Sequence, residues 1–335
     1  MLVFPTKNNL NCITPENEEE DPTPKFLLSE NEKALIYYKE NGYVVFKSLL
    51  SSIQCQELMS CWQSEVKPYQ GYIYRQATAK AEKNILNDKG FVMNPILNLQ
   101  SLNPKYFDGL RSTFERAVLS NSQLSKATES LLGEKPRIVQ SMYFEGNSAT
   151  WEHQDSYYLD DEIPGKMAAA WIALEDIAPD AGRFFVCPKS HNYDYSDMNI
   201  ENNIATNHEG YISSIVDLIK NEGFDIRAPR LLQGDVLFWN SMTIHGSLNT
   251  TQSLRSRSSI TFHAIRSSSK FNVLRTSLRD VGGKSDNCFD IYRPKDQVSK
   301  RNKLIFTIES RFPKPFYALK KLAITSLLAL KRVKS

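Results

Sequence analysis

Residues 234–247 read GDVLFWNSMTIHGS, and this stretch limits the possible fold classes more than any other part of the chain. The turn residues Gly234 and Asp235 lead into a short β-branched and aromatic run over 235–239, which is typical of a buried strand. Similar short runs lie at 137–144, 166–174, 183–188 and 258–265. Because no regular helices alternate with these runs, they favour an antiparallel sandwich or barrel over repeated strand–helix units.

Helical signals lie mainly before these strands. Helices are expected over residues 29–41, 51–66 and 103–132. Ser29 and Glu32 read as a capping box at the start of the first helix, and Gly42 is a typical stop signal at its end. A short strand is expected at 43–46. Helices first and strands later predict an α+β protein with a mainly β core.

The remaining segments divide the chain further. Residues 1–28 are acidic, contain prolines and show no helical period, so they predict an extended lead-in. The main domain is expected over 29–295. Within it, residues 191–231 form the longest break between strands and are a candidate lid, with a helix over 211–220. Residues 296–335 read as a basic, amphipathic C-terminal tail.

Composition and charge limit the class of protein. The chain has 335 residues, of which 41% are hydrophobic, and this excludes a disordered chain, a collagen and a coiled coil. The net charge of +3 carries no signature of a nucleic-acid partner. Residues 300–335 hold ten basic side chains and one acidic side chain, so this segment carries +9 and leaves −6 for the rest.

The basic tail has two readings. Phe316, Leu319, Leu322, Leu327 and Leu330 recur near helical spacing among lysines. Such a stripe packs on the acidic body of the protein, which is the simpler reading, or makes peripheral contact with an anionic membrane surface. No apolar run reaches the roughly 20 residues needed to cross a bilayer, so no transmembrane segment is expected.

The cysteines and the first ten residues predict a reducing, cytoplasmic location. The cysteines are Cys12, Cys55, Cys61, Cys187 and Cys288, and no two of them form a CxxC pair. An odd number at such spacing is a poor disulfide framework and a poor zinc site. The start of the chain lacks the basic and apolar regions of a signal peptide. The sequence leaves the oligomeric state open.

Two of the five histidines and one aspartate are the residues most suited to chemistry. In His153-Gln154-Asp155, the outer two side chains share one face if the segment is a strand. His245 follows the strand expected at 235–239. Two imidazoles and one carboxylate form the facial triad of non-haem Fe(II) oxygenases, which leaves coordination positions open. An HxD pair alone is a weak signal, since either histidine could be structural.

The order of the motifs carries more weight than any one of them. Trp151-Glu152-His153-Gln154-Asp155, the segment GRFFVCPKSH at 182–191 and His245-Gly246-Ser247 follow one another along the chain. In this combination the chain resembles the phytanoyl-CoA dioxygenase family, from about residue 30 to 270. The resemblance implies a double-stranded β-helix, or cupin-like jelly roll, and an Fe(II)- and 2-oxoglutarate-dependent dioxygenase. It implies His153, Asp155 and His245 as catalytic iron ligands.

The same resemblance implies a pocket for 2-oxoglutarate. Arg257 would bind its far carboxylate, because it begins a strand with an apolar residue three positions on and a histidine six positions on, and because a planar guanidinium suits a bidentate carboxylate. Arg255 stays a second candidate, since the span from the second metal histidine is slightly longer than in other phytanoyl-type members. Ser247 would add a hydroxyl donor, and Trp171 and Met142 would line the pocket.

The implied reaction oxidises an unactivated C–H bond of a small organic molecule with O2 and releases succinate and CO2. Hydroxylation is the main expectation, and desaturation, ring closure or epimerisation occur at related sites. A biosynthetic role on a secondary metabolite, an amino-acid derivative or a sugar-linked compound is as compatible as an acyl substrate. Asp155 argues against the halogenating relatives, which carry a small residue in its place.

Gln140, Tyr157 and Arg183 are candidates for substrate contact. Gln140 shares a strand face with Met142, and Tyr157 closely follows the HxD motif. Arg183 stands where the family commonly has a small or apolar residue, so it could face the site and meet an anionic substrate. Lys189 is a second departure, because it stands where the family often has a glycine before Ser-His.

The remaining histidines have structural expectations: His191 in a turn, His263 in a core or pocket wall and His208 in the candidate lid. Two other function classes stay open. One is a non-catalytic jelly-roll protein that binds a metal or ligand, and the other is a zinc hydrolase with the same triad. Arg257 weighs against both, because neither class needs a buried cation for a distal carboxylate.

Overall fold

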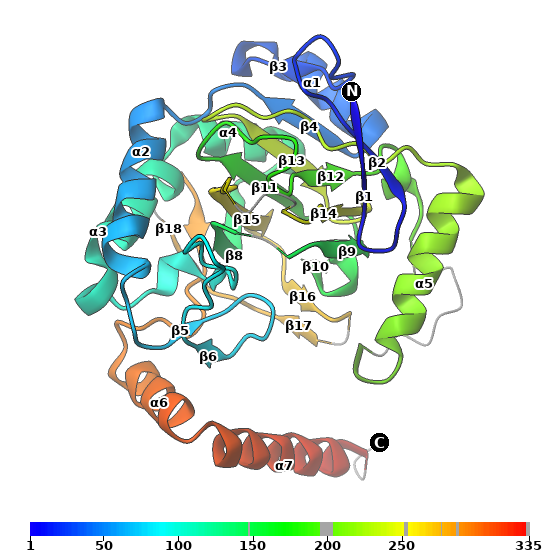
Figure 1. Ribbon diagram of the computed structural model, residues 1–335. Helices are drawn as coiled ribbons and strands as arrows, with labels where there is room; N and C mark the ends of the chain where they lie inside the picture. The colour runs from blue at the N-terminus through cyan, green and yellow to red at the C-terminus, as the bar shows by residue number, and fades with distance from the viewer. Residues whose placement is uncertain (147, 195–203, 251–253, 276, 286–287, 333–335) are drawn as a thin grey trace.

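Two β-sheets that lie face to face form the centre of the molecule, and helices cover the outer face of the larger sheet (Figure 1). The computed structural model describes the chain except for residues 147, 195–203, 251–253, 276, 286–287 and 333–335. The side chains of residues 204–206, 284–285 and 323–332 also lie outside the description. The candidate lid and the C-terminal tail are therefore described only in part.

The larger sheet is antiparallel at its centre and has the strand order β18-β19-β8-β15-β11-β13-β4-β3. Its central strands are β8 (Pro136–Phe144), β15 (Ser259–Arg266), β11 (Ala168–Ala173), β13 (Val236–Asn240) and β4 (Tyr43–Phe46). Its outer strands are β3 (Lys25–Phe26), β18 (Lys284–Ser285), β19 (Asp290–Ile291) and β7 (Ile96–Leu97), which pairs with β8. Most neighbouring strands are far apart in sequence, as expected of a sandwich rather than of strand–helix repeats.

The smaller sheet holds β12 (Phe184–Val186), β14 (His245–Ser247) and β9 (Thr150–His153) in that order. Both of its pairings are antiparallel. The ring of Phe184 lies across the interior from the larger sheet, with its centroid 6.1 Å from that of Trp171 and 4.6 Å from that of Trp239. The two sheets therefore enclose a common interior, as the strand pattern predicts.

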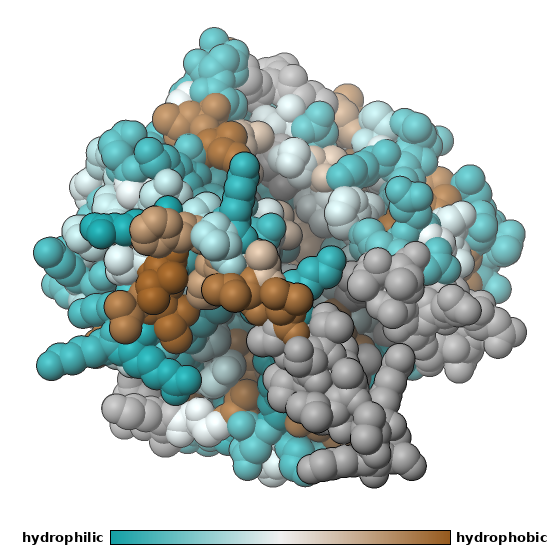
Figure 2. All heavy atoms as spheres, turned by 90° about the horizontal axis from the view of Figure 1, so that it is seen from below, coloured by the Kyte–Doolittle hydropathy of each residue, from teal (hydrophilic) through white to brown (hydrophobic). Residues whose placement is uncertain are grey.

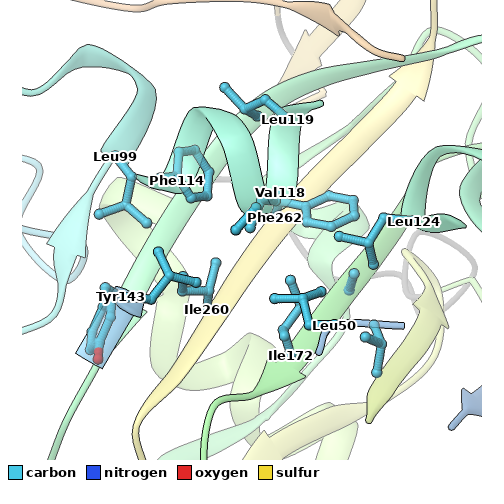
Figure 3. Close-up of a cluster of buried hydrophobic side chains, with 14 of the residues drawn as sticks. Leu50, Leu99, Phe114, Val118, Leu119, Leu124, Tyr143, Ile172, Ile260 and Phe262 are labelled. Carbon is cyan, nitrogen blue, oxygen red and sulfur yellow. The ribbon is translucent and has the colours of Figure 1, made fainter. Parts of the chain in front are cut away.

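Residues of the larger sheet alternate between this interior and the helical side. Trp171 belongs to the apolar cluster between the sheets, and the next residue, Ile172, belongs to the cluster under the helices. Figure 3 shows the helical side, where the labelled residues include Phe114, Val118, Leu124, Ile172, Ile260 and Phe262. Each strand thus contributes to the core and to the interior with adjacent residues.

Four helices accompany the larger sheet: α1 (Asn31–Asn41), α2 (Ser52–Cys61), α3 (Pro104–Phe114) and α4 (Ser122–Leu132). The π-helical turns Trp62–Val66 and Glu115–Leu119 extend α2 and α3. The helix predicted over 103–132 is divided, because the Asn121 side chain accepts hydrogen bonds from the Gln123 and Leu124 amides and so starts α4 anew.

The ends of α1 confirm one sequence prediction and correct another. Gly42 takes a φ of 78° and its amide bonds to the Tyr38 carbonyl, which is the expected glycine stop. The capping box predicted at Ser29 is wrong. Ser29 lies inside the 3₁₀ turn Leu28–Glu30, and the Glu30 carboxylate accepts from the Leu27 amide instead. The carboxylate that caps this turn is therefore that of Glu30, two residues earlier than the sequence pattern indicates.

Residues 1–28 contain two extended strands that pack on the rest of the fold. Strands β1 (Leu2–Pro5) and β2 (Asn11–Thr14) form a hairpin, and Cys12 and Thr14 are fully buried. Ile13 exchanges backbone hydrogen bonds of 2.9 Å with Ile226 and Ala228. This charged, proline-containing stretch has no helical period because it forms strands and turns. Its few apolar residues are enough to hold it against the rest of the fold.

The turn of this hairpin docks against the smaller sheet. Glu152 of β9 is fully buried, and its two carboxylate oxygens accept hydrogen bonds from the Thr6 hydroxyl and the Asn8 amide. Two further small strand groups in the described residues complete the fold: β5 (Ile73–Tyr74) with β6 (Ala81–Glu82), and β10 (Leu159–Asp161) with β16 (Phe271–Val273) and β17 (Ser277–Arg279). The hairpin therefore tethers the N-terminus to β9, an outer strand of the smaller sheet.

The helix expected over 211–220 is confirmed and is longer than predicted. Helix α5 runs over Ile204–Glu222, with non-helical backbone at Asn207. Its residues Tyr211, Ile215 and Ile219 are buried in an apolar cluster. The described part of the candidate lid is thus a docked helix, and residues 195–203 lie outside the described residues.

The C-terminal tail forms two helices, α6 (Lys300–Arg311) and α7 (Pro313–Arg332), which follow one another below the sheets in Figure 1. Among the described residues, neither these nor any other helix is long and apolar enough to cross a membrane. The predicted packing on the acidic body holds for one face of α6, where Glu309 is buried.

Glu152→Ala tests whether the N-terminal hairpin contributes to stability. The substitution leaves the Thr6 hydroxyl and the Asn8 amide without their acceptor, so we expect the free energy of unfolding to fall by about 2–4 kcal/mol. Urea denaturation followed by circular dichroism measures this change. Glu57→Ala is the control, since Glu57 forms an exposed ion pair with Arg116 that is worth at most about 1 kcal/mol. Equal losses for the two variants would contradict the prediction.

Candidate metal centre and cosubstrate pocket

Three side chains converge at the end of the smaller sheet. His153 ends β9, Asp155 begins the 3₁₀ turn Asp155–Tyr157, and His245 begins β14. The register of β9 and β14 pairs His153 with His245, and their ring centroids are 4.3 Å apart. One ligand atom from each of the three lies within 4.8 Å of the others. Within the described part of the chain, this is the single group of His, Cys, Asp and Glu with a geometry suited to a metal ion.

Backbone carbonyls fix which nitrogen of each histidine is available. Nδ1 of His153 lies 2.8 Å from the Trp151 carbonyl oxygen, and Nδ1 of His245 lies 2.9 Å from that of Thr243. Because a carbonyl oxygen only accepts, each Nδ1 carries the proton and each Nε2 keeps its lone pair. The two Nε2 atoms lie 3.8 and 3.5 Å from Oδ1 of Asp155. These three atoms form the candidate ligand set.

The second oxygen of Asp155 is held by the larger sheet. The indole N–H of Trp239, on β13, donates to Oδ2 at 2.8 Å, and Nε2 of His263, on β15, lies 3.2 Å from the same atom. All three side chains are buried. These partners orient the carboxylate so that Oδ1 is directed at the two histidines, which is the usual role of groups behind a metal ligand.

The protonation states suit metal binding. Burial, followed by repulsion from His245, lowers the pKa of His153 to about 3. Burial alone would raise the pKa of Asp155, but the imidazoles of His245 and His263 outweigh it and hold that pKa well below its usual range. A neutral imidazole and an ionised carboxylate are the forms that coordinate a divalent ion.

Arg257 is a buried cation in the interior. Its side chain is 2% exposed, one guanidinium N–H donates to the Gly182 carbonyl at 2.8 Å, and the group lies over the Phe144 ring at 5.0 Å. Its Nε has no hydrogen-bond partner, and no carboxylate of the described residues forms an ion pair with it. Burial therefore lowers its pKa to about 9. Such a charge is costly unless a ligand brings the opposite one.

Arg255 has a different environment. Its side chain is 57% exposed, and its Nε lies 3.9 Å from Oδ1 of Asp180. A guanidinium that is open to water and near an acid has no need of a ligand carboxylate. Of the two arginines that the sequence proposes, the interior of the sandwich thus holds Arg257.

The predicted pocket-lining residues share the interior face. Met142 and Trp171 both pair with Thr261 of β15, from its two sides, so their side chains point the same way. The Trp171 indole N–H and the Ser259 hydroxyl are buried without a described partner. Together with Arg257 they supply unmatched hydrogen-bond donors on one face, which fits an oxygen-rich anion such as 2-oxoglutarate.

Ser247 lies two residues after His245 on β14 and opposite Phe184 of the interior cluster. Its hydroxyl donates to Oγ1 of Thr150 at 3.0 Å and accepts from the Thr150 amide at 3.2 Å. The residue therefore has the expected position, and Thr150 is the partner of its hydroxyl in this structure.

Arg183 and Tyr157, two of the three residues proposed for substrate contact, have other partners in the structure. Arg183 is buried, but its guanidinium donates to the carbonyls of Ile177 at 2.9 Å and Pro15 at 2.7 Å, so it supports the N-terminal segment. Tyr157 stacks on Tyr211 of α5, with centroids 3.7 Å apart. Both residues follow the motifs directly in sequence, but the local backbone turns their side chains into packing.

Gln140 has the position that the sequence predicts. It is half-buried on β8, opposite His263 in the register with β15. Tyr158, rather than Tyr157, is the tyrosine beside the triad, with its ring centroid 5.6 Å from that of His153. Its hydroxyl accepts a hydrogen bond from the Trp151 indole at 3.3 Å. Nothing in the sequence distinguishes the two tyrosines, since a 3₁₀ turn at Asp155 decides their directions.

Sequence reasoning missed the support of Asp155. Trp239 lies two residues after Leu237, so its side chain points to the same interior face as the pocket. His263 was expected in a core or pocket wall, and it contacts Asp155 directly. The available signal was strand parity: His263 and Arg257 are six residues apart and so fall on one face of an extended segment.

The other departures and histidines have structural explanations. Lys189 adopts a φ of 69°, the left-handed conformation that glycine adopts without strain. Nε2 of His191 lies 3.1 Å from the Lys39 carbonyl, so this ring joins the turn to α1. His208 of α5 packs near Trp151, with ring centroids 5.1 Å apart.

Several solved structures share this fold. The non-heme alpha ketoglutarate dependent carbocyclase SnoK from nogalamycin biosynthesis is 16% identical, with a TM-score of 0.54 over 74% of this chain and 89% of that one. The epimerase SnoN, in complex with Fe3+, alpha ketoglutarate and nogalamycin RO, is 17% identical, with a TM-score of 0.53 over 79% and 95%. EctD from S. alaskensis, with 2-oxoglutarate and 5-hydroxyectoine, is 15% identical, with a TM-score of 0.51 over 80% and 88%.

These similarities confirm the predicted jelly-roll fold. No curated protein sequence matches the chain. The family model of phytanoyl-CoA dioxygenase (PhyH) matches residues 38–258, which is more than half of the chain and includes both strands that carry the triad histidines. The resemblance seen in the motifs is therefore confirmed, and the chain belongs to the phytanoyl-CoA dioxygenase family.

Proposed function

We propose that this protein is an Fe(II)- and 2-oxoglutarate-dependent dioxygenase that oxidises an unactivated C–H bond of a small organic molecule. The observation that carries the proposal is the pairing of two features in one interior. One is the set of His153, Asp155 and His245, and the other is the buried cation of Arg257 without a described carboxylate partner.

Each residue has a definite task in this proposal. Nε2 of His153, Nε2 of His245 and Oδ1 of Asp155 hold Fe(II), and their backbone and side-chain partners keep them in place. Arg257 receives the far carboxylate of 2-oxoglutarate, with Ser247 as a neighbouring hydroxyl. Iron with 2-oxoglutarate and O2 supplies the oxidant and yields succinate and CO2.

The pocket walls have their own part in the reaction. Trp171 and Met142 line the cosubstrate pocket, and the apolar interior between the sheets excludes water from it. Gln140 and Tyr158 are the residues that we assign to substrate contact, because one is half-buried on the interior face and the other lies beside His153. Substrate orientation by such groups decides which C–H bond reacts.

The two other function classes explain less of this interior. A zinc hydrolase would use the triad but would leave Arg257 buried without an opposite charge. A binding protein without turnover would not require both a three-residue metal site and a buried guanidinium in the same interior. The desolvation of a guanidinium costs several kcal/mol, so a retained buried arginine calls for a ligand that compensates it.

Hydroxylation is the outcome we propose first, with ring closure, desaturation or epimerisation as variants of the same oxidation. The similar folds include a carbocyclase and an epimerase, which bears on the range of outcomes that this architecture permits. A biosynthetic role in the cytoplasm fits five free cysteines, of which Cys12, Cys55 and Cys187 are fully buried. Burial raises the pKa of the Cys12 thiol to about 12, which keeps it protonated.

Iron-dependent turnover of 2-oxoglutarate is the direct test of the proposed function. Protein purified without oxygen, then given Fe(II), 2-oxoglutarate and O2, is expected to form succinate, and a true substrate among added compounds should increase the rate. His153→Ala should abolish succinate formation. Arg257→Ala should raise the KM for 2-oxoglutarate about 100-fold or more, because the far carboxylate loses a buried charge partner.

Arg255→Ala is the matched control for this assay. Its guanidinium is exposed, so we expect the KM for 2-oxoglutarate to stay within about twofold of the original value. An Arg255→Ala effect as large as that of Arg257→Ala would reject our assignment of the carboxylate site. Iron binding without any succinate, with or without candidate substrates, would favour a non-catalytic protein.

Trp239→Phe tests the support of Asp155 separately from turnover. The change removes the N–H donor to Oδ2 and keeps an aromatic ring, so the affinity for Fe(II) or Co(II) should fall about 10- to 100-fold. Trp171→Phe is the control, because its indole N–H has no described partner and 2-oxoglutarate is left out. Titration of the apo-protein monitored by calorimetry gives both affinities, and unchanged binding by Trp239→Phe would refute this role.

A further inference from the structure

An exposed apolar stripe runs along α6. Leu304 and Ile308 are four residues apart, which places them on one side of the helix, and Phe312 follows as the residue that ends it; the three side chains are 62%, 42% and 60% exposed. Large apolar side chains at regular spacing on one helix face are uncommon on a protein surface that meets only water. This side of α6 is therefore a candidate contact surface.

The first turns of α7 continue the apolar surface. Leu319 and Leu322 are about two-thirds exposed. Seen from below in Figure 2, apolar side chains gather into a patch over α6 and the start of α7, with hydrophilic side chains at its border. We call the exposed residues Leu304, Ile308, Phe312, Leu319 and Leu322 the tail patch.

The opposite side of α6 is anchored to the body, so the direction of the tail patch is fixed. Glu309 is buried and accepts hydrogen bonds from the Tyr74 hydroxyl at 3.0 Å and the Ala81 amide at 3.1 Å. The ring of Phe306 packs on Tyr74, with centroids 5.1 Å apart, and the Tyr317 hydroxyl of α7 also donates to Glu309. The tail patch therefore lies on the side of α6 that faces away from the body of the protein.

Basic residues surround the tail patch. Lys300, Arg301, Lys303, Arg311 and Lys314 are exposed, and none of them forms an ion pair with a described residue. The segment 300–335 carries ten basic residues against Glu309 alone. Since Glu309 is buried and already bonded, the described surface of α6 and of the first turns of α7 presents positive charge around an apolar centre.

We infer that the tail patch docks the protein on an anionic lipid surface. The apolar side chains enter the boundary between headgroups and acyl chains, and the surrounding lysines and arginines contact anionic headgroups. The helices lie in the plane of the membrane and do not cross it. This inference is independent of the reaction that we propose for the jelly-roll domain.

The chemistry of the surface favours a membrane over other partners. A nucleic acid would satisfy the positive charges but would leave the leucines and phenylalanine in water. A second copy packed on the same surface would bring two segments of +9 together, which like-charge repulsion opposes. Of these three partners, an anionic bilayer is the one that offers negative charge and an apolar layer in the same place.

Vesicle sedimentation with the full-length protein tests this inference. We expect at least tenfold stronger binding to vesicles of phosphatidylcholine with phosphatidylserine than to phosphatidylcholine alone, since each basic residue at such a surface contributes about fivefold. High salt should weaken binding to the anionic vesicles. The double variant Leu304→Ser and Leu319→Ser should bind them about tenfold more weakly, because it removes two apolar side chains from the interface.

The matched control carries the same chemical change elsewhere. Ile36 of α1 and Ile53 of α2 are 67% and 69% exposed, so the double variant Ile36→Ser and Ile53→Ser should bind like the original protein. Circular dichroism verifies that both double variants are folded. Equal binding to the two kinds of vesicle, equal weakening by both double variants, or a dimer that only the Leu304 and Leu319 changes dissociate would each overturn the inference.

Discussion

The hydrogen bonds to Oδ2 of Asp155 are the constraint on which the candidate site depends. Asp155 lies in a turn after a strand of the smaller sheet, and Trp239 and His263 reach it from the larger sheet. A carboxylate in a turn would otherwise be free to rotate, and its Oδ1 would lose its place beside the two histidines. The face-to-face packing of the sheets is therefore what joins a pair of histidines on one sheet to an oriented carboxylate.

Arg257 is buried in the same interior, and its burial has an energetic cost. A guanidinium with a single described hydrogen bond and no described acid beside it destabilises the fold by several kcal/mol. Hydrophobic packing on the helical side, where Ile260 and Phe262 alternate with the pocket residues of the same strand, offsets this cost. A cosubstrate carboxylate that binds Arg257 would remove this desolvation penalty. Part of the free energy of cosubstrate binding therefore comes from relieving a cost that the folded protein already carries.

Much of this arrangement could be predicted from sequence, and the failures have a common cause. Period-two strands, the glycine stop at Gly42 and the spacing of the HxD motif are local signals that the fold preserves. The direction of the Tyr157 side chain could not be predicted, because in a turn it depends on backbone angles that proximity to a motif does not reveal. Arg183 precedes the interior-facing Phe184, so its side chain lies on the other face of the strand. The docking of the N-terminal hairpin on Glu152 could not be predicted, because it is a contact across nearly half of the chain for which neither partner carries a local signature.

The position of Glu152 shows why this distant contact concerns the site. On β9, Glu152 and His153 are adjacent, so their side chains point to opposite faces of the smaller sheet. The inward face carries the histidine, and the outward face carries a buried carboxylate that the turn of the hairpin satisfies through Thr6 and Asn8. A short strand with an unsatisfied buried charge on one face would not hold the register that pairs His153 with His245. The N-terminal residues thus belong to the architecture of the metal centre, although none of them reaches it.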